Sequence, residues 1–167
     1  MNKTVKTIAR NGIIAAMYVV FTLLTYPVSF GLYQLRAAEM LVLLCFFRKD
    51  YAFGLTIGCA IVNLFSAEIG IIDVLFGTCA TLISCLLIGF SKHLWFACLI
   101  PIVVNGFIVG AELTYFAGME NFWVSAGFVA LGELGAMILG YVLFMFLKKR
   151  CKFFELIEAN QNREFRC

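Results

Sequence analysis

Six long apolar runs constrain this chain more than any other feature. They cover residues 11–30, 32–47, 51–67, 71–91, 94–117 and 122–147. The runs are continuous rather than alternating, which predicts helices, because a helix satisfies its own backbone hydrogen bonds in lipid whereas membrane strands alternate in short segments. The chain is 63% hydrophobic and 14% charged, against about 25% charged residues in soluble domains. We therefore predict an all-α, polytopic membrane protein with a bundle of six transmembrane helices.

The prediction is one domain that fills residues 1–167, with short cytoplasmic tails at 1–8 and 148–167. Two of its apolar runs are short. At about 1.5 Å per residue, run 32–47 covers about 24 Å, less than the roughly 30 Å core of a bilayer. Runs 32–47 and 51–67 are therefore expected to be half-spans or helices that begin deep in a cavity.

The basic residues predict the orientation. Of the 13 Lys and Arg residues, all but Arg36 fall on one side when the N-terminus is placed in the cytoplasm, as the positive-inside rule requires. This predicts an even number of crossings with both termini cytoplasmic, and it explains the net charge of +3 without a nucleic-acid partner. The run after Arg10 continues through Pro27 without a small-residue cleavage site, so we interpret it as a first helix rather than a signal peptide.

The sequence contains none of the common motifs for catalysis or metal binding. It has no GxxxxGK[ST] phosphate loop, HExxH or GxSxG motif, and its one histidine, His93, lies beside Lys92 in a predicted cytoplasmic loop. The seven cysteines form no CxxC pair or metal spacing, so we interpret them as small hydrophobic residues. We predict no enzyme activity, catalytic residue, metal or cofactor in this chain.

Charged and amide side chains inside the apolar runs predict a polar pocket. A charge near the bilayer centre costs about 2.5–3.5 kcal/mol on insertion scales, so each one needs a partner or a wet cavity. The candidates are Arg36, Glu39, Asn63, Asp73, Asn105, Glu112 and Glu133. They favour the outer parts of the runs, whereas the inner halves of the last two runs carry nothing comparable. We expect a pocket open to the outside above an apolar floor.

Helical spacing supports the convergence of these side chains. Common helix faces are predicted for Asp73, Gly77, Thr81 and Ser84, for Asn105 and Glu112, and for Thr56, Cys59 and Asn63. The alternative is interhelical hydrogen bonding, worth about 0.6 kcal/mol per pair, or, for Glu133, an internal ion pair with Arg36. Arg36 and Glu39 are also spaced for a salt bridge at a helix start.

Small residues form a separate pattern of helical repeats. The sets are Gly132, Ala136 and Gly140, then Gly106 and Gly110, and then Ala9, Gly12 and Ala16 with Ala15 adjacent. The first two sets predict close approach of helix backbones. The third set is interpreted either as packing within the protein or as a docking face for another membrane protein.

Three ordered segments of this chain resemble the QueT family. They are residues 33–41, 54–64 and 73–82, and the likeness runs from about residue 8 to residue 147. Members of this family are queuosine precursor transporters of bacterial cell membranes. They are the substrate-binding S components of energy-coupling factor transporters, which serve vitamin uptake.

The resemblance implies a six-helix S-component fold that holds its substrate near the outer face. It implies a transmembrane T component and two cytoplasmic ATPases as partners that use ATP, in agreement with the missing phosphate loop. S components commonly dock through an alanine-rich motif on the first helix. The corresponding stretch implies partner docking by Ala9, Gly12, Ala15 and Ala16, although Gly12 departs from a clean Ala-x-x-x-Ala spacing.

The implied substrate is a 7-deazapurine: preQ0, preQ1 or queuine. A guanine-like edge offers two N–H donors to a carboxylate, its carbonyl accepts from Arg or an amide, and an amine of preQ1 or queuine wants a second carboxylate. We expect the following roles: Glu133 or Asp73 for the edge, Glu112 or Glu39 for the amine, and Arg36, Asn63 or Asn105 for the carbonyl. The aromatic residues near the outer surface are expected either to stack on the ring or to form an interfacial belt: Tyr33, Tyr115, Phe116 and Trp123.

Other functions fit the same sequence. Within transport, the alternatives are an S component for another vitamin or a standalone small-molecule carrier. A different class is a membrane enzyme or an assembly factor without a transported ligand. Copurification of two ATPases and a T subunit, and a ligand screen across deazapurines and vitamins, distinguish these possibilities.

Overall fold

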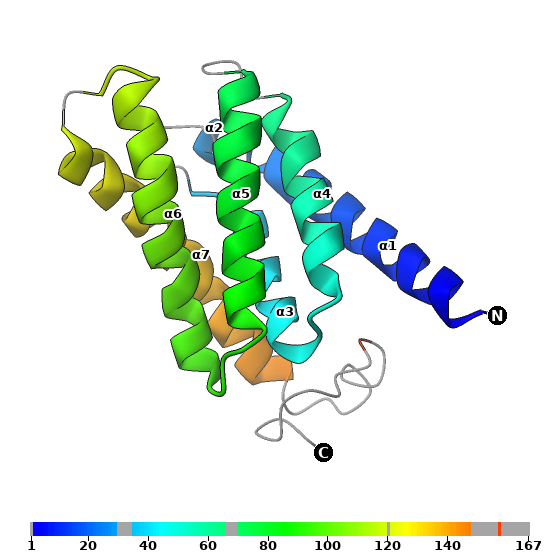
Figure 1. The fold of residues 1–167 in the computed structure, drawn as a ribbon. Helices are drawn as coiled ribbons and strands as arrows, with labels where there is room; N and C mark the ends of the chain where they lie inside the picture. Colours follow the sequence, from blue (N-terminus) through cyan, green and yellow to red (C-terminus); the bar gives the residue numbers. More distant parts are fainter. Residues whose placement is uncertain (1, 30–34, 66–69, 120, 148–156, 158–167) are drawn as a thin grey trace.

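The computed structural model describes residues 2–29, 35–65, 70–119, 121–147 and 157, and every regular element in these ranges is a helix (Figure 1). The elements are α1 (Lys3–Leu24), α2 (Tyr26–Ser29), the 3-10 helix η1 (Ala37–Leu43), α3 (Leu44–Phe47), α4 (Tyr51–Asn63), α5 (Ile71–Ile88), α6 (Leu94–Tyr115) and α7 (Phe122–Leu147). Each of the six apolar runs contains a helix, which confirms the all-α prediction. Residues 3–8 of the predicted N-terminal tail form the first turns of α1, whereas 148–156 and 158–167 of the other tail lie outside the described residues.

Four of these helices have the length and composition of membrane spans. They are α1, α5, α6 and α7, whereas residues 37–47 and 51–63 form shorter apolar helices. The 13 residues of α4 rise only about 20 Å. Aromatic side chains are exposed near both ends of α6, with Trp95 at 57% and Tyr115 at 76% exposure, as in the aromatic belts at membrane interfaces. The fold is therefore that of a multi-pass membrane protein.

The segment after Arg36 differs from the expected α-helix. Its first seven residues, Ala37–Leu43, wind as the 3-10 helix η1, and the Glu39 amide closes the first turn on the Arg36 carbonyl at 2.9 Å. A 3-10 helix rises about 2.0 Å per residue against about 1.5 Å in an α-helix, so a short segment reaches further.

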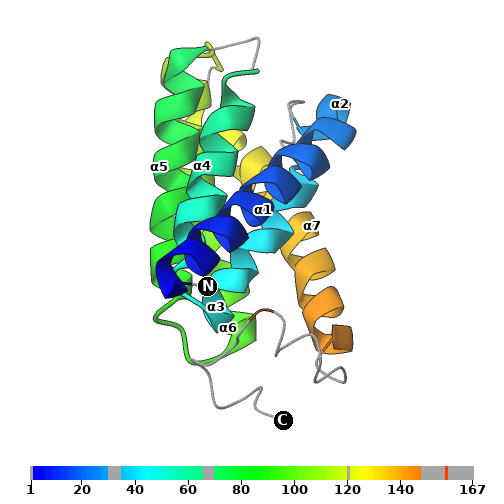
Figure 2. The same cartoon turned by 90° about the vertical axis from the view of Figure 1, so that its right-hand side faces the viewer.

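η1 and α3 occupy the centre of the bundle. Helices α4, α5 and α6 stand side by side as one layer; α1 crosses α4 obliquely, α7 crosses α6, and η1 is enclosed among these helices (Figures 1 and 2). Glycine permits the close contact between η1 and α7, because a Cβ at Gly140 would lie 2.9 Å from Leu43 Cδ1. Gly110 permits a similarly close contact between α6 and α7, since a Cβ at this position would lie 2.7 Å from Ala126 Cα. These contacts support the predicted packing role of the small residues.

An apolar block fills one end of the bundle. The ring of Phe47 contacts those of Phe46 and Phe144, with centroids 5.3 Å and 5.2 Å apart. Ile88, at the end of α5, and Leu94, at the start of α6, are buried in the same cluster. The polar residues of the runs lie beyond this block. The apolar block therefore closes one end of the bundle, and its place below a pocket open to the outside stays a prediction.

Candidate ligand-binding site

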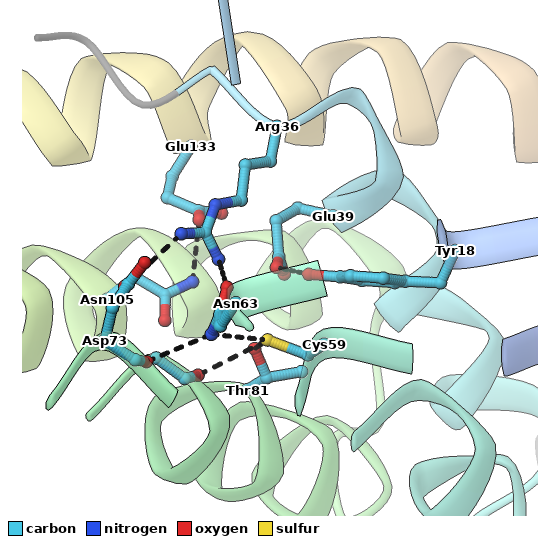
Figure 3. A network of polar contacts seen from close by, with 10 residues as sticks. Tyr18, Arg36, Glu39, Cys59, Asn63, Asp73, Thr81, Asn105 and Glu133 are labelled. Carbon is cyan, nitrogen blue, oxygen red and sulfur yellow. Dashed lines mark hydrogen bonds and ion pairs between the residues drawn. The ribbon is translucent and has the colours of Figure 1, made fainter. Parts of the chain in front are cut away.

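The seven polar residues singled out from the sequence are all buried at the other end of the bundle. Their exposed fractions are between 0% and 6%. They come from different segments of the chain. Arg36 directly precedes η1 and Glu39 lies in its first turn. The others lie on α4 (Asn63), α5 (Asp73), α6 (Asn105 and Glu112) and α7 (Glu133). Six of the seven are drawn together in Figure 3. The predicted convergence is confirmed, whereas a role in substrate binding stays a prediction.

Arg36 joins the end of α4 to the beginning of α5. Its Nη1 donates to Asn63 Oδ1 at 2.8 Å, and its Nη2 lies 3.6 Å from Asp73 Oδ1 (Figure 3). Asn63 in turn donates from Nδ2 to the Asp73 carbonyl at 3.1 Å. The helix dipoles favour this arrangement, because α4 directs its negative C-terminal end toward the guanidinium and Asp73 lies in the first turn of α5.

A glycine on α5 makes room for this network. Gly77 lies on the helix face shared with Asp73, Thr81 and Ser84, all of which are buried, as the spacing predicted. A Cβ at Gly77 would lie 2.5 Å from Asn63 Nδ2. Any larger residue would therefore displace the amide that bonds Arg36.

A second connection joins α6 to α7. Asn105 Nδ2 donates to Glu133 Oε1 at 2.7 Å. The other carboxylate oxygen, Glu133 Oε2, is buried and receives no hydrogen bond from the described part of the chain. Glu133, the acid whose depth is hardest to explain structurally, is thus held by an amide and keeps one oxygen for another donor.

Glu39 shows the same pattern, with a partner that the sequence analysis missed. The hydroxyl of Tyr18, on α1, donates to Glu39 Oε1, while Oε2 has no donor among the described residues. Tyr18 is fully buried. The sequence of an apolar run does not show where a tyrosine hydroxyl points. The partner of Tyr18 is therefore identified only by the contacts between the packed helices.

The two half-satisfied carboxylates face a common cavity. Its volume is about 10 Å³, room for about one water molecule. It is lined by Arg36, Glu39, Gly77, Thr81, Asn105, Val109, Val129 and Glu133. Buried polar atoms are usually hydrogen-bonded, and leaving one unsatisfied costs free energy. Each of the two acids therefore has one buried oxygen that could accept a further hydrogen bond.

Glu112 stands apart from this cavity. Its side chain is fully buried, and neither oxygen receives a hydrogen bond from the residues that the structure describes. Glu112 is therefore buried but does not line the cavity.

The aromatic candidates do not line the cavity. Tyr115, Phe116 and Trp123 are 76%, 51% and 71% exposed, which favours the interfacial belt over stacking on a ligand. The fourth candidate, Tyr33, lies outside the described residues.

The four predicted docking residues on α1 divide between two faces. Ala9, Gly12 and Ala16 are exposed, and a Cβ at Gly12 would meet nothing within 4 Å. Ala15 is 8% exposed and packs on α4, where a Cβ at Gly58 would lie 3.0 Å from the Ala15 carbonyl. The exposed face therefore consists of three of the four residues.

Comparison with known proteins identifies the family of this chain. The family model described as QueT transporter matches residues 8–149. The chain belongs to the QueT transporter family. A QueT relative from Lactococcus lactis subsp. cremoris (strain MG1363), named queuosine precursor transporter QueT, is 32% identical over 155 residues, covering 83% of this chain and 90% of that protein. No solved structure matches the chain.

Proposed function

We propose that this chain binds a queuosine precursor, a 7-deazapurine such as preQ1, preQ0 or queuine, as the membrane component of its importer. The observation that carries the proposal is the cavity lined by Arg36, Glu39 and Glu133, in which each of the two acids has one buried oxygen without a donor among the described residues. Membership of the QueT family and the name of the Lactococcus relative support the substrate class.

The contacts narrow the roles of the acids. Asp73 is engaged by Arg36, so we assign Glu133 to the guanine-like edge and Glu39 to the amine of preQ1 or queuine. Both carboxylates retain an oxygen for this purpose, and charge-assisted hydrogen bonds of this kind are about twice as strong as neutral ones. Arg36 and Asn105, which also line the cavity, are the donors for the ligand carbonyl.

A purine-sized ligand needs more space than the cavity offers. Its volume of about 10 Å³ holds about one water molecule. Binding therefore requires side chains or helices around the cavity to move apart, and the ligand selects or induces that wider state. We expect ligand binding to raise the melting temperature of the purified protein, because a ligand that binds only the folded state stabilises it.

The finer part of the proposal is the energy-coupling factor assembly. In this assembly the chain crosses the membrane six times, and both of its termini are cytoplasmic. A T component with two ATPases supplies the energy for transport. The exposed small residues Ala9, Gly12 and Ala16 on α1 support a docking face, since small residues let membrane helices approach closely. Copurification from the native membrane is expected to recover a T subunit and two ATPases.

The experiment that tests the proposal is a binding screen with purified protein. preQ1, preQ0 and queuine are compared with a panel of vitamins by calorimetry or thermal shift. Binding of a deazapurine in preference to every vitamin is the expected result. Binding of a vitamin alone indicates an S component of another specificity, and recovery without ATPases indicates a standalone carrier. A protein that binds no ligand of the panel contradicts the proposed function.

A further inference from the structure

Tyr18 connects α1 to the wall of the cavity. Its side chain has no exposed surface, and its hydroxyl donates to Glu39 Oε1 on η1. Figure 3 shows the tyrosine ring reaching from α1 to this carboxylate at one side of the polar cluster. Tyr18 itself does not line the cavity. Any effect of Tyr18 on a ligand must therefore pass through Glu39.

The hydrogen bond fixes which way the Glu39 carboxylate points. One oxygen is held by Tyr18, and the other has no donor in the described ranges and belongs to a cavity-lining residue. A glutamate has three side-chain torsions and several rotamers. Without the hydroxyl, the carboxylate is free to adopt other rotamers, in which the open oxygen no longer keeps its position.

The position of Tyr18 is set by the contact between α1 and α4. A Cβ at Gly58 would lie 2.9 Å from the Cβ of Tyr18, so the base of the tyrosine side chain packs directly against this glycine. Four residues earlier on α4, the Gly54 amide donates to Asn11 Oδ1 of α1 at 2.8 Å. The two helices are thus held at a fixed separation at both points, which leaves the ring little freedom.

We propose that Tyr18 is a positioning residue for ligand binding, which holds one oxygen of Glu39 so that the other faces the cavity. This inference rests on the proposed function. It adds that the position of α1 determines the orientation of the Glu39 carboxylate, the acid assigned to the ligand amine. The outer face of the same helix is exposed at Ala9, Gly12 and Ala16. A displacement of α1 would therefore act on the Tyr18–Glu39 bond.

The test is a double-mutant cycle with preQ1 as the probe. Tyr18→Phe removes only the hydroxyl and is expected to weaken preQ1 binding about tenfold, the size of one hydrogen bond to a charged group. Glu39→Ala weakens binding by at least as much. In the Glu39→Ala background Tyr18→Phe is expected to cause no further loss, because the acceptor is gone and the two effects are not additive.

Two matched controls separate positioning from general damage. Tyr51→Phe removes another buried tyrosine hydroxyl, which donates to the Ile157 carbonyl, and is expected to leave the affinity unchanged. Gly58→Ala forces the ring of Tyr18 to shift and is expected to weaken binding, whereas Gly127→Ala, with open space around the new Cβ, is not.

The outcomes are distinguishable from failure of the proposed function. If wild-type protein binds preQ1 and Tyr18→Phe binds it equally well, the inference is wrong. It is also wrong if Tyr18→Phe causes the same fold loss with and without Glu39, since that result assigns the effect to packing. Wild-type protein that binds no deazapurine overturns the proposed function, and the role of Tyr18 falls with it.

Discussion

Two sides of the buried polar cluster differ in whether their acids lie beside a guanidinium or are held by neutral groups. On one side, the guanidinium of Arg36 is bonded to Asn63 and lies beside Asp73, and Asn63 is bonded back to α5. On the other side, Glu39 and Glu133 each use one oxygen within the protein and leave the second without a donor among the described residues. The first side joins α4 to α5 through Arg36, whereas the second keeps acceptor oxygens that the proposed ligand would use.

This difference separates stability from affinity. Substitutions on the Arg36 side should lower the free energy of unfolding, because they leave buried charged or polar groups without partners. Substitutions of the half-satisfied acids should lower ligand affinity and leave the fold intact.

The largest effect is expected for Arg36→Met. Removing one partner of a buried ion pair typically costs about 3–5 kcal/mol, here because Asp73 and Asn63 stay buried. Thermal unfolding in detergent measures the loss. Arg36→Lys keeps the charge but loses the planar fork, so it is expected to recover part of the stability. Arg36→Met protein that melts at the wild-type temperature would show that the arginine serves only the ligand.

Gly77→Ala is expected to have the next largest effect on stability. The new Cβ would lie 2.5 Å from Asn63 Nδ2, so the amide must move and its bonds weaken. Overpacking of this kind costs about 1–3 kcal/mol. The control is Gly127→Ala in the same thermal assay, which has open space around its Cβ. Equal melting temperatures for the two variants contradict the role of Gly77.

Glu133→Gln is expected to weaken preQ1 binding about tenfold or more, or about 1.4 kcal/mol, with little change in stability. The glutamine oxygen still accepts from Asn105, whose bond to Glu133 is 2.7 Å. Its amide nitrogen, however, presents donors where the ligand also presents donors. Calorimetric titration gives the affinity. Unchanged affinity in well-folded protein removes Glu133 from the site.

Glu112→Gln is expected to change the affinity for preQ1 less than about threefold, under 1 kcal/mol. This acid is buried but does not line the cavity. Because a neutral amide is less costly to bury than a carboxylate without donors, the variant should melt at or above the wild-type temperature. A loss of affinity as large as that of Glu133→Gln would place Glu112 in contact with the ligand.

Much of the architecture was predictable because it depends on hydropathy and period alone. The apolar runs located every long helix, and the spacing of Asp73, Gly77 and Thr81 located the buried face of α5. The depth of Glu133 in its run was enough to single it out. These signals are local, and each is repeated several times along the chain.

The rest depends on contacts between distant segments. No local pattern shows that the hydroxyl of Tyr18 meets Glu39, 21 residues away, or that Ala15 packs inward while Ala16 is exposed. The 3-10 winding of η1 was missed for the same reason, since it follows from the space between the surrounding helices. Which acids keep an open oxygen is also a property of the assembled bundle.

The short central helices have a consequence for how the protein enters the membrane during synthesis. Residues 37–47 are too few to span a bilayer core. They also include Glu39 and directly follow Arg36, so this segment alone is a poor substrate for insertion. Arg36 meets Asn63 and Asp73 only after α4 and the first turn of α5 have been made. The central segment must therefore enter together with later helices, as a unit whose charge is neutralised by residues translated after it.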